Sequence, residues 1–223
     1  MTEQGTVVAI SRQLGAGGSI VGRSIARTFG WRYADREILH EASRRLHADD
    51  AELAALEERV ETVWERLAPL FLFGVSAGPA IPPLPPALTG PGLFAVEREI
   101  LQSLAARGSV VIVGRGGAHV LRDHPGLVTV FLHADELVRT ERLAERLDAT
   151  QRHHAADLVR QSDRQRSEFN KSLSGRDWTD ATQYDLSIDT SAADLNTIGD
   201  VVAALLTTRG FAPADAPRPH KGT

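Results

Sequence analysis

The hydrophobic positions of this chain form short uninterrupted apolar runs, separated by stretches in which apolar residues recur with helical spacing. In the first helical stretch, Val21, Ile25 and Phe29 lie at i, i+4 and i+8, on one face of a helix. Strands that are apolar throughout are typical of a parallel sheet covered by helices on both faces. We therefore expect an α/β fold with five parallel strands, at about residues 7–10, 31–33, 110–113, 127–132 and 184–188.

The remaining periodic stretches predict helices between and after these strands. A helix over 50–70 carries an apolar stripe from Leu53 to Leu70 with charged residues on its other faces. This stripe packs either against a neighbouring helix of the same chain or against a second copy in a homodimer. Residues 71–92 are rich in proline and glycine and predict an irregular segment, either a functional cover or a linker. The other helices are expected at about 19–29, 36–46, 93–107, 135–146, 153–173 and 195–207.

A glycine-rich turn joins the first strand to the first helix. Backbone N–H groups in such a turn, together with the positive end of the helix dipole, favour a phosphate. The turn nearly matches the Walker A (P-loop) pattern G-x-x-x-x-G-K-[ST], with Arg12 replacing the first glycine and Gly18 replacing the lysine. Ser19 supplies the hydroxyl expected to bind Mg²⁺. The expected phosphate-binding residues are Arg12, Gly15, Ala16, Gly17, Gly18 and Ser19.

Polar and charged residues follow the other strands, at the sheet edge where ligands bind in open α/β folds. Arg115 lies between glycines after the third strand and is expected to bind a phosphate through its planar guanidinium. Asp35 and Asp189 either orient a nucleoside or a Mg²⁺-bound water, or cap helices. Arg139, Arg142 and Arg146 are interpreted mostly as a solvated helix face, whereas a mobile basic flap at 160–166 is expected to bring an arginine to a transferring phosphate.

Composition narrows the class of protein. The 223 residues carry a net charge of −4, which disfavours nucleic acid or a membrane surface as the main partner. The chain contains no cysteine, which excludes disulfides and thiolate catalysis and suits a reducing cytoplasm. No signal peptide and no apolar run of membrane-spanning length is recognised. These features predict a cytoplasmic enzyme or binding protein with a small-molecule partner.

In order and spacing, several segments resemble the nucleoside monophosphate kinases, and most closely their cytidylate-kinase-like group. The resemblance covers about residues 6–207. The segments are ISRQLGAGG (10–18), YADREIL (33–39), VIVGRGGAHVL (111–121), VFLHA with the helix after it (130–146), SDRQR (162–166) and YDLSIDTS (184–191).

This resemblance implies one P-loop kinase-like domain over 1–210, with an acceptor arm at about 47–92, an arginine-bearing lid at about 148–180 and a disordered tail at 211–223. It implies the reaction ATP + CMP (or dCMP) → ADP + CDP, with Mg²⁺. Asp35 and Arg36 would lie near the acceptor nucleotide, and Arg115 would bind the acceptor phosphate. The residues matching the lid are Asp163, Arg164 and Arg166.

Three departures from the family pattern leave alternatives open. Gly18 removes the P-loop lysine, and Arg12 or a lid arginine would have to supply its charge. Gly116 stands where cytidylate kinases carry an aspartate, and residues 74–92 do not match their acceptor-binding domain. The alternatives to a nucleotide kinase are a degenerate P-loop protein that binds nucleotide as a sensor or assembly switch, and a kinase of a non-nucleotide substrate.

Overall fold

The computed structural model describes residues 5–35, 91–114 and 116–214. Its centre is a five-stranded parallel sheet in the order β2-β3-β1-β4-β5. The fold class, the parallel pairing and the position of each strand therefore confirm the sequence prediction. The strands are β1 (Val7–Arg12), β2 (Arg32–Ala34), β3 (Val110–Val113), β4 (Leu127–His133) and β5 (Leu186–Asp189).

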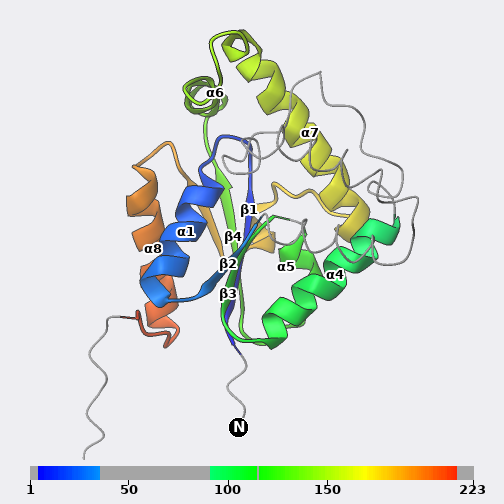
Figure 1. Cartoon of the computed structure of the whole chain (residues 1–223), viewed down its shortest axis with the longest axis vertical. Coiled ribbons are helices and arrows are strands. Elements are labelled where there is room, and N and C mark those ends of the chain that lie inside the picture. Colours follow the sequence, from blue (N-terminus) through cyan, green and yellow to red (C-terminus); the bar gives the residue numbers. More distant parts are fainter. Residues whose placement is uncertain (1–4, 36–90, 115, 215–223) are drawn as a thin grey trace, which may run out of the picture.

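Helices cover both faces of the sheet (Figure 1). Helices α1 and α8 pack side by side on one face, and α4 and the short α5 lie on the other. Helices α6 and α7 stand together beyond the carboxyl ends of the strands. The helices are α1 (Gly18–Phe29), α4 (Pro91–Ala106), α5 (Gly117–Val120), α6 (Glu136–Ala144), α7 (Ala155–Ser174) and α8 (Leu195–Thr208), with short 3-10 helices at Arg152–His154 and Ala181–Gln183.

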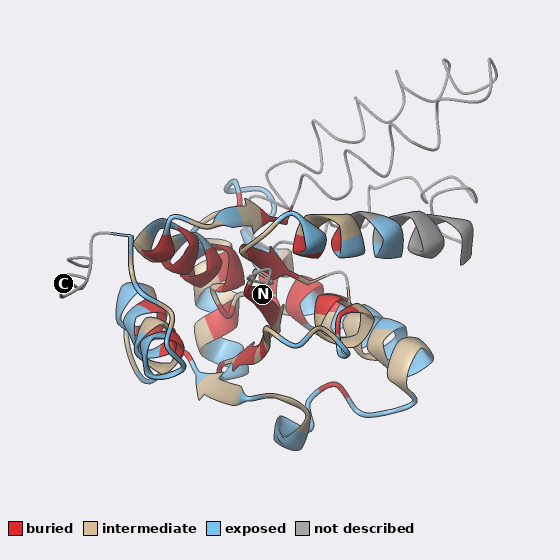
Figure 2. Cartoon of the chain, turned by 90° about the horizontal axis from the view of Figure 1, so that it is seen from below, coloured by how far each residue is buried: buried red, intermediate tan, exposed pale blue. Residues whose placement is uncertain are grey.

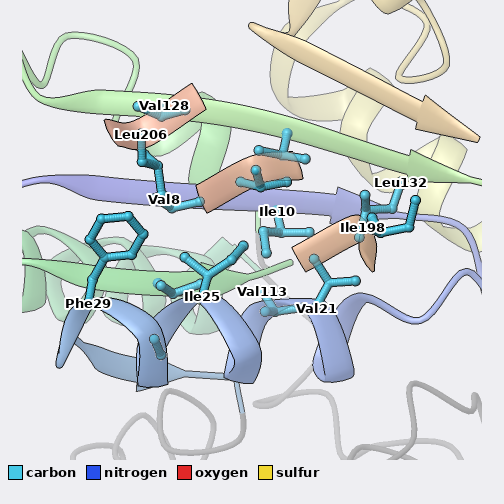
Figure 3. Close-up of a cluster of buried hydrophobic side chains, with 14 of the residues drawn as sticks. Val8, Ile10, Val21, Ile25, Phe29, Val113, Val128, Leu132, Ile198 and Leu206 are labelled. Carbon is cyan, nitrogen blue, oxygen red and sulfur yellow. The ribbon is translucent and has the colours of Figure 1, made fainter. Parts of the chain in front are cut away.

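The larger hydrophobic core lies between the sheet and helices α1 and α8 (Figure 3). Val21, Ile25 and Phe29 point from α1 toward the sheet, as their i, i+4, i+8 spacing predicts. A smaller cluster, including Leu101 and Ile112, fills the opposite face beneath α4 and α5. Both sides of the central strands are therefore buried, as Figure 2 shows, and this explains why these strands are apolar throughout.

A third apolar cluster lies outside the sheet, between α6 and α7. Leu14, from the loop after β1, is only 1% exposed and belongs to this cluster together with Leu143 and Leu158. The loop that leaves β1 is therefore part of the packing of the α6–α7 pair. This contact places the two helices directly against the glycine-rich turn.

Several sequence expectations fall beyond the described residues. They are the helices at 36–46 and 50–70, with the proposed dimer stripe, and nearly all of the proline-rich segment. Of the tail expected at 211–223, the structure describes residues 211–214, where Phe211 packs edge-on against Trp31 at 5.9 Å and the N–H of Ala214 donates to the carbonyl of Thr28. Across the described parts of the chain, no helix is both long and apolar enough to cross a bilayer.

Candidate functional site

The glycine-rich turn connects the end of β1 to the start of α1 at the carboxyl edge of the sheet (Figure 1). Gly17 is the N-cap of α1 and adopts a left-handed conformation with φ of 80°, which favours glycine. It provides no side chain to cap the helix. The first amides of a helix have no partner within it, so those that follow Gly17 are available to an anion at the positive end of the helix dipole.

Ser19, in the first turn of α1, is hydrogen-bonded to the end of β2. Its hydroxyl donates to Oδ2 of Asp35 at 3.0 Å, and the phenolic hydroxyl of Tyr33 donates to the same oxygen at 3.1 Å. Ser19 is 6% exposed and Asp35 only 4%. Burial, followed by the nearby Asp35 carboxylate, raises the pKa of Tyr33 to about 12. Tyr33 therefore remains a neutral hydrogen-bond donor to Asp35 across the physiological pH range.

Arg12 ends β1, and its side chain runs across the glycine-rich turn. A Cβ atom on Gly18 would lie 2.7 Å from Cγ of Arg12, and a Cβ atom on Gly114 would lie 1.9 Å from its Nη1. The guanidinium is 3.8 Å from Asp35, measured from Nη2 to Oδ1. Its Nε atom is buried and has no hydrogen-bond partner within the described parts of the chain. Arg12 thus brings a positive charge to the point where α1, β2 and β3 meet.

Asp163 on α7 is bonded to the loop just before the glycines. Its Oδ1 accepts a hydrogen bond from the N–H of Leu14 at 2.9 Å, and its Oδ2 lies 2.5 Å from Nη1 of Arg139. Arg139 also donates to the carbonyls of Leu14 and Ala134, at 3.2 and 2.9 Å. With 5% exposure, Arg139 is buried. The expectation of a solvated arginine face on this helix is therefore wrong for Arg139, which joins the loop to α6 and α7.

The lid arginines differ in their surroundings. Nη1 of Arg166 lies 3.7 Å from Oδ1 of Asp163, on the side of α7 that faces the loop, whereas Arg164 is exposed. Further along α7, Phe169 and Leu173 lie over the turn after β3, and a Cβ atom on Gly116 would be 2.6 Å from Cδ1 of Leu173. The helix therefore extends from the glycine-rich turn to the expected acceptor motif. The remaining predicted site residues, Arg36 and Arg115, lie outside the described residues.

Of the two aspartates with alternative roles, the structure separates one from the cluster. Oδ1 of Asp189 accepts from the N–H of Ser191 at 2.8 Å, and these bonds from Ser191 lower the pKa of Asp189. Asp189 is exposed and stabilises the turn after β5. Asp35, in contrast, is buried beside Ser19. The described carboxyl edge therefore brings together Arg12, Gly15, Ala16, Gly17, Gly18, Ser19, Asp35, Asp163 and Arg166.

Sequence reasoning missed Arg139 and the role of Tyr33. A signal for Arg139 was present, because Arg139, Leu143 and Leu147 recur at i, i+4 and i+8, and the two leucines are apolar. Arg139 is therefore on the inward stripe of α6. For Tyr33, the available signal is its place two residues before Asp35.

The cluster suits a phosphate with a divalent metal. The guanidinium groups of Arg12, Arg139 and Arg166 outnumber the carboxylates of Asp35 and Asp163, so the surroundings favour an anion. The Ser19 hydroxyl and Asp35 carboxylate are hard oxygen ligands of the kind that Mg²⁺ prefers. Within the described residues there is no group of three or more His, Cys, Asp or Glu side chains able to hold a metal. Mg²⁺ in nucleotide sites is commonly held by one or two protein oxygens plus phosphates, so the donor set fits.

A parallel sheet in the order 2-3-1-4-5, with a glycine-rich turn opening α1, is the fold of the P-loop kinases. More specifically, the chain belongs to the cytidylate kinase-like family, whose model matches residues 7–192. No match is found among curated proteins.

Solved structures share the fold. An uncharacterised protein from Eubacterium ventriosum superposes with a TM-score of 0.67 at 20% identity, covering 93% of this chain and 100% of that one. A shikimate kinase from Acinetobacter baumannii, solved with shikimate, superposes with a TM-score of 0.50 at 15% identity, covering 93% of this chain and 96% of that one. At these identities, the likeness establishes the fold alone.

Proposed function

We propose that this protein transfers the γ-phosphoryl group of ATP to CMP, dCMP or a related small acceptor. Membership of a kinase-like family supports phosphoryl transfer as the reaction class. The observation that carries the proposal is the buried hydrogen bond between Ser19 and Asp35, directly below the amides that follow Gly17. This arrangement combines an anion-binding helix start with hard oxygen ligands for a metal.

Phosphoryl transfer requires positioning and charge neutralisation more than a covalent nucleophile. An oxygen of the acceptor forms a bond to the γ-phosphorus as the bond to the bridging oxygen breaks, and ADP leaves with that electron pair. Amides of Gly15, Gly17 and Gly18 would bind phosphate oxygens of ATP, and Ala16, whose N–H donates to the carbonyl of Gln13, would line the same turn. Ser19 would bind Mg²⁺, which when present neutralises phosphate charge. Tyr33, as a neutral donor, would hold the Asp35 carboxylate toward Ser19.

The acceptor would lie on the opposite side of the phosphates, toward β2 and β3. Asp35, Arg36 and Arg115 are proposed to bind it, with Arg115 on its phosphate. Arg166 and Arg164 are proposed to bring positive charge from α7 to the transferring phosphoryl group. Asp163 is proposed to hold Arg166 and the loop after β1 in position. The contact of 3.7 Å between Arg166 and Asp163, beside the loop, supports Arg166 over the exposed Arg164.

Base recognition is the point at which this chain departs from cytidylate kinases. A side chain at Gly116, where those enzymes carry an aspartate, would collide with Leu173 of α7 at 2.6 Å. Gly116 also has a φ of +65°, a conformation that L side chains rarely adopt. The acceptor therefore has to be recognised without that carboxylate, so the candidates include small phosphorylated or hydroxylated compounds.

The direct test is a coupled ADP-release assay with Mg²⁺, ATP and each nucleoside monophosphate, deoxynucleoside monophosphate or small alcohol in turn. We expect acceptor-dependent ADP release, greatest with CMP, dCMP or a close relative. Arg115→Ala should abolish it. Arg122→Ala is the matched control, because Arg122 is 67% exposed and pairs with the exposed Asp123. ADP release that needs no acceptor, or none with any acceptor, would contradict the proposal.

The missing lysine favours a second candidate, a nucleotide-binding sensor or switch without turnover. Gly18 removes the cation that usually contacts the β- and γ-phosphates in P-loops. This candidate predicts that ATP raises the unfolding temperature while no acceptor elicits ADP release. Both quantities are measured on the same preparation, so the two candidates give distinct results.

A further inference from the structure

We propose that Arg12 takes the place of the P-loop lysine, and that Gly18 is a glycine because the Arg12 side chain occupies the space that a side chain at this position would fill. The inference rests on the proposed function, since it assigns the cation of the same phosphate site. It selects one residue where the sequence left Arg12 and the lid arginines as alternatives. It also makes positions 12 and 18 of the turn interdependent.

The first step of the argument is the space beside Gly18. A Cβ atom on Gly18 would lie 2.7 Å from Cγ of Arg12, 3.2 Å from its Cβ and 3.3 Å from its Cδ. The aliphatic part of the arginine therefore lies directly against the residue that replaces the lysine. A lysine at 18 and an arginine at 12, in their present arrangement, exclude each other.

The second step is the position of the guanidinium. A Cβ atom on Gly114 would lie 1.9 Å from Nη1 and 2.8 Å from Cζ of Arg12, so the charged end fills the side-chain position after β3. Gly114, whose φ of +81° itself favours glycine, directly follows Val113, which pairs with Ile10, and its N–H donates to the carbonyl of Ile10 in β1. The charge thus lies between the carboxyl ends of β1 and β3, at the edge where the phosphates of a bound nucleotide are expected.

The third step is that the Arg12 guanidinium still has an N–H group available to a ligand. The side chain is 15% exposed, and among the described residues the closest carboxylate oxygen, from Asp35, is 3.8 Å away, beyond hydrogen-bond length. Nε is buried without a hydrogen-bond partner within the described residues. A buried guanidinium N–H without a partner is costly. A phosphate oxygen is a strong acceptor that would satisfy it, and arginine suits phosphate because its donors form a planar fork.

Among the described residues of this edge, Arg139 is already committed to other contacts. Arg139 donates to two backbone carbonyls and contacts Asp163, so its hydrogen-bonding groups hold the protein together. Arg166 is on α7, across the loop from Gly18, and contacts Asp163. Only the Arg12 stem touches the space at Gly18 among the atoms nearest to it.

The test is a cation-relocation experiment, in which the binding of ATP with Mg²⁺ is measured by calorimetry and turnover by ADP release. Arg12→Gln keeps a polar side chain of similar path but removes the charge, and should weaken binding by about tenfold or more and lower kcat by about 100-fold. Gly18→Lys alone should not improve either quantity, because its stem meets Arg12. The double variant Arg12→Ala/Gly18→Lys should recover a clear part of what Arg12→Ala loses. Arg122→Ala controls for the loss of one positive charge.

Each outcome has one meaning. If the unaltered protein binds no nucleoside triphosphate, the proposed function fails and this inference fails with it. If the unaltered protein binds ATP and Arg12→Gln binds and reacts equally well, only the role of Arg12 is overturned. Improved binding by Gly18→Lys in the presence of Arg12 would overturn the exclusion between the two positions. If Arg12→Gln and Arg12→Ala both fail to fold, ATP binding is measured on Arg12→Lys, which keeps the charge. The affinity for ATP that Arg12→Lys retains should exceed any affinity that Gly18→Lys adds.

Discussion

Oδ1 of Asp163 accepts a hydrogen bond at 2.9 Å from the backbone N–H of Leu14, a residue 149 positions earlier in the chain. The other oxygen of the carboxylate contacts Arg139, which in turn donates to the carbonyl of Leu14. Both backbone groups of Leu14 are therefore held by the α6–α7 pair, and its side chain is buried between the same helices. The start of the glycine-rich turn is therefore held by α6 and α7 as well as by β1.

The first prediction concerns the hydrogen bonds by which Asp163 and Arg139 hold the backbone of Leu14. Asp163→Ala leaves the buried Arg139 without its carboxylate and frees the N–H of Leu14, and should lower the free energy of unfolding by about 3 kcal/mol. The value is taken from the low end of the range for buried pairs because Asp163 is 18% exposed. Denaturant unfolding measures the change.

The matched control is Asp157→Ala on the same helix. Asp157 pairs with Arg160 where both side chains are exposed, and exposed pairs contribute little to stability. The control should unfold close to the unaltered protein. Equal losses of unfolding free energy from both substitutions would show that the hydrogen bonds around Leu14 do not stabilise the fold. Nucleotide affinity should fall only in Asp163→Ala.

The second prediction concerns Gly15, which has a φ of +81° and would place a Cβ atom 2.6 Å from the carbonyl oxygen of Arg139. Gly15→Ala should combine left-handed strain of about 1–2 kcal/mol with an overpacking cost of about 1–3 kcal/mol. Gly175→Ala is the control, since Gly175 has a φ of +70° and nothing within 4 Å. Thermal or denaturant unfolding should therefore show the larger loss for Gly15→Ala. Equal losses would mean that the turn moves away from α6 without cost.

The third prediction concerns the metal. Chelation of divalent cations should abolish ADP release, and added Mg²⁺ should restore it. Ser19→Ala removes both a proposed ligand and the donor to Asp35, and should raise the Mg²⁺ concentration for half-maximal activity by about 10- to 100-fold. Thr207→Val removes a hydroxyl from the exposed side of α8 and should leave this concentration unchanged. Mg²⁺ dependence unaltered by Ser19→Ala would exclude this serine as a ligand.

The fourth prediction concerns pH. Burial and the Asp35 carboxylate raise the pKa of Tyr33 from 10.0 to about 12, so the folded protein holds this proton more tightly than the unfolded chain. The associated stability is fully present below pH 10 and is lost as the pH rises through 12. The chain has two tyrosines, so Tyr184→Phe leaves Tyr33 as its single phenol. Absorbance of the phenolate should then titrate near 12, and a midpoint near 10 would contradict the burial of Tyr33 beside Asp35.

Local patterns were sufficient to predict most of the fold. Apolar runs located the strands, and the residues after them correctly located the edge that collects Arg12, Ser19 and Asp35. The short helix α5 was not predicted, because four residues give no periodicity to recognise. The sequence also indicated that Ser19 opens a helix after a glycine turn, since this information is contained in adjacent residues.

Contacts between distant residues were less accessible. Arg139 reads as one member of a charged run, and its burial depends on Leu14 and Asp163, which are 125 and 24 positions away. The relation of Arg12 to Gly18 and Gly114 likewise depends on the path of one side chain across two strands. In the sequence, Gly18 looks like the loss of the P-loop lysine. In the structure, the absence of a side chain at Gly18 leaves room for the side chain of Arg12.

Because the stem of Arg12 passes against Gly18 and its head fills the place beside Gly114, no single substitution leads from this loop to the common lysine-bearing one. If Gly18→Lys occurred first, the new side chain would meet Arg12. If Arg12 were lost first, the loop would lack the positive charge that the end of β1 provides. Chains built in this way are separated from lysine-bearing relatives by a paired change, and a motif search that requires the lysine will pass over them.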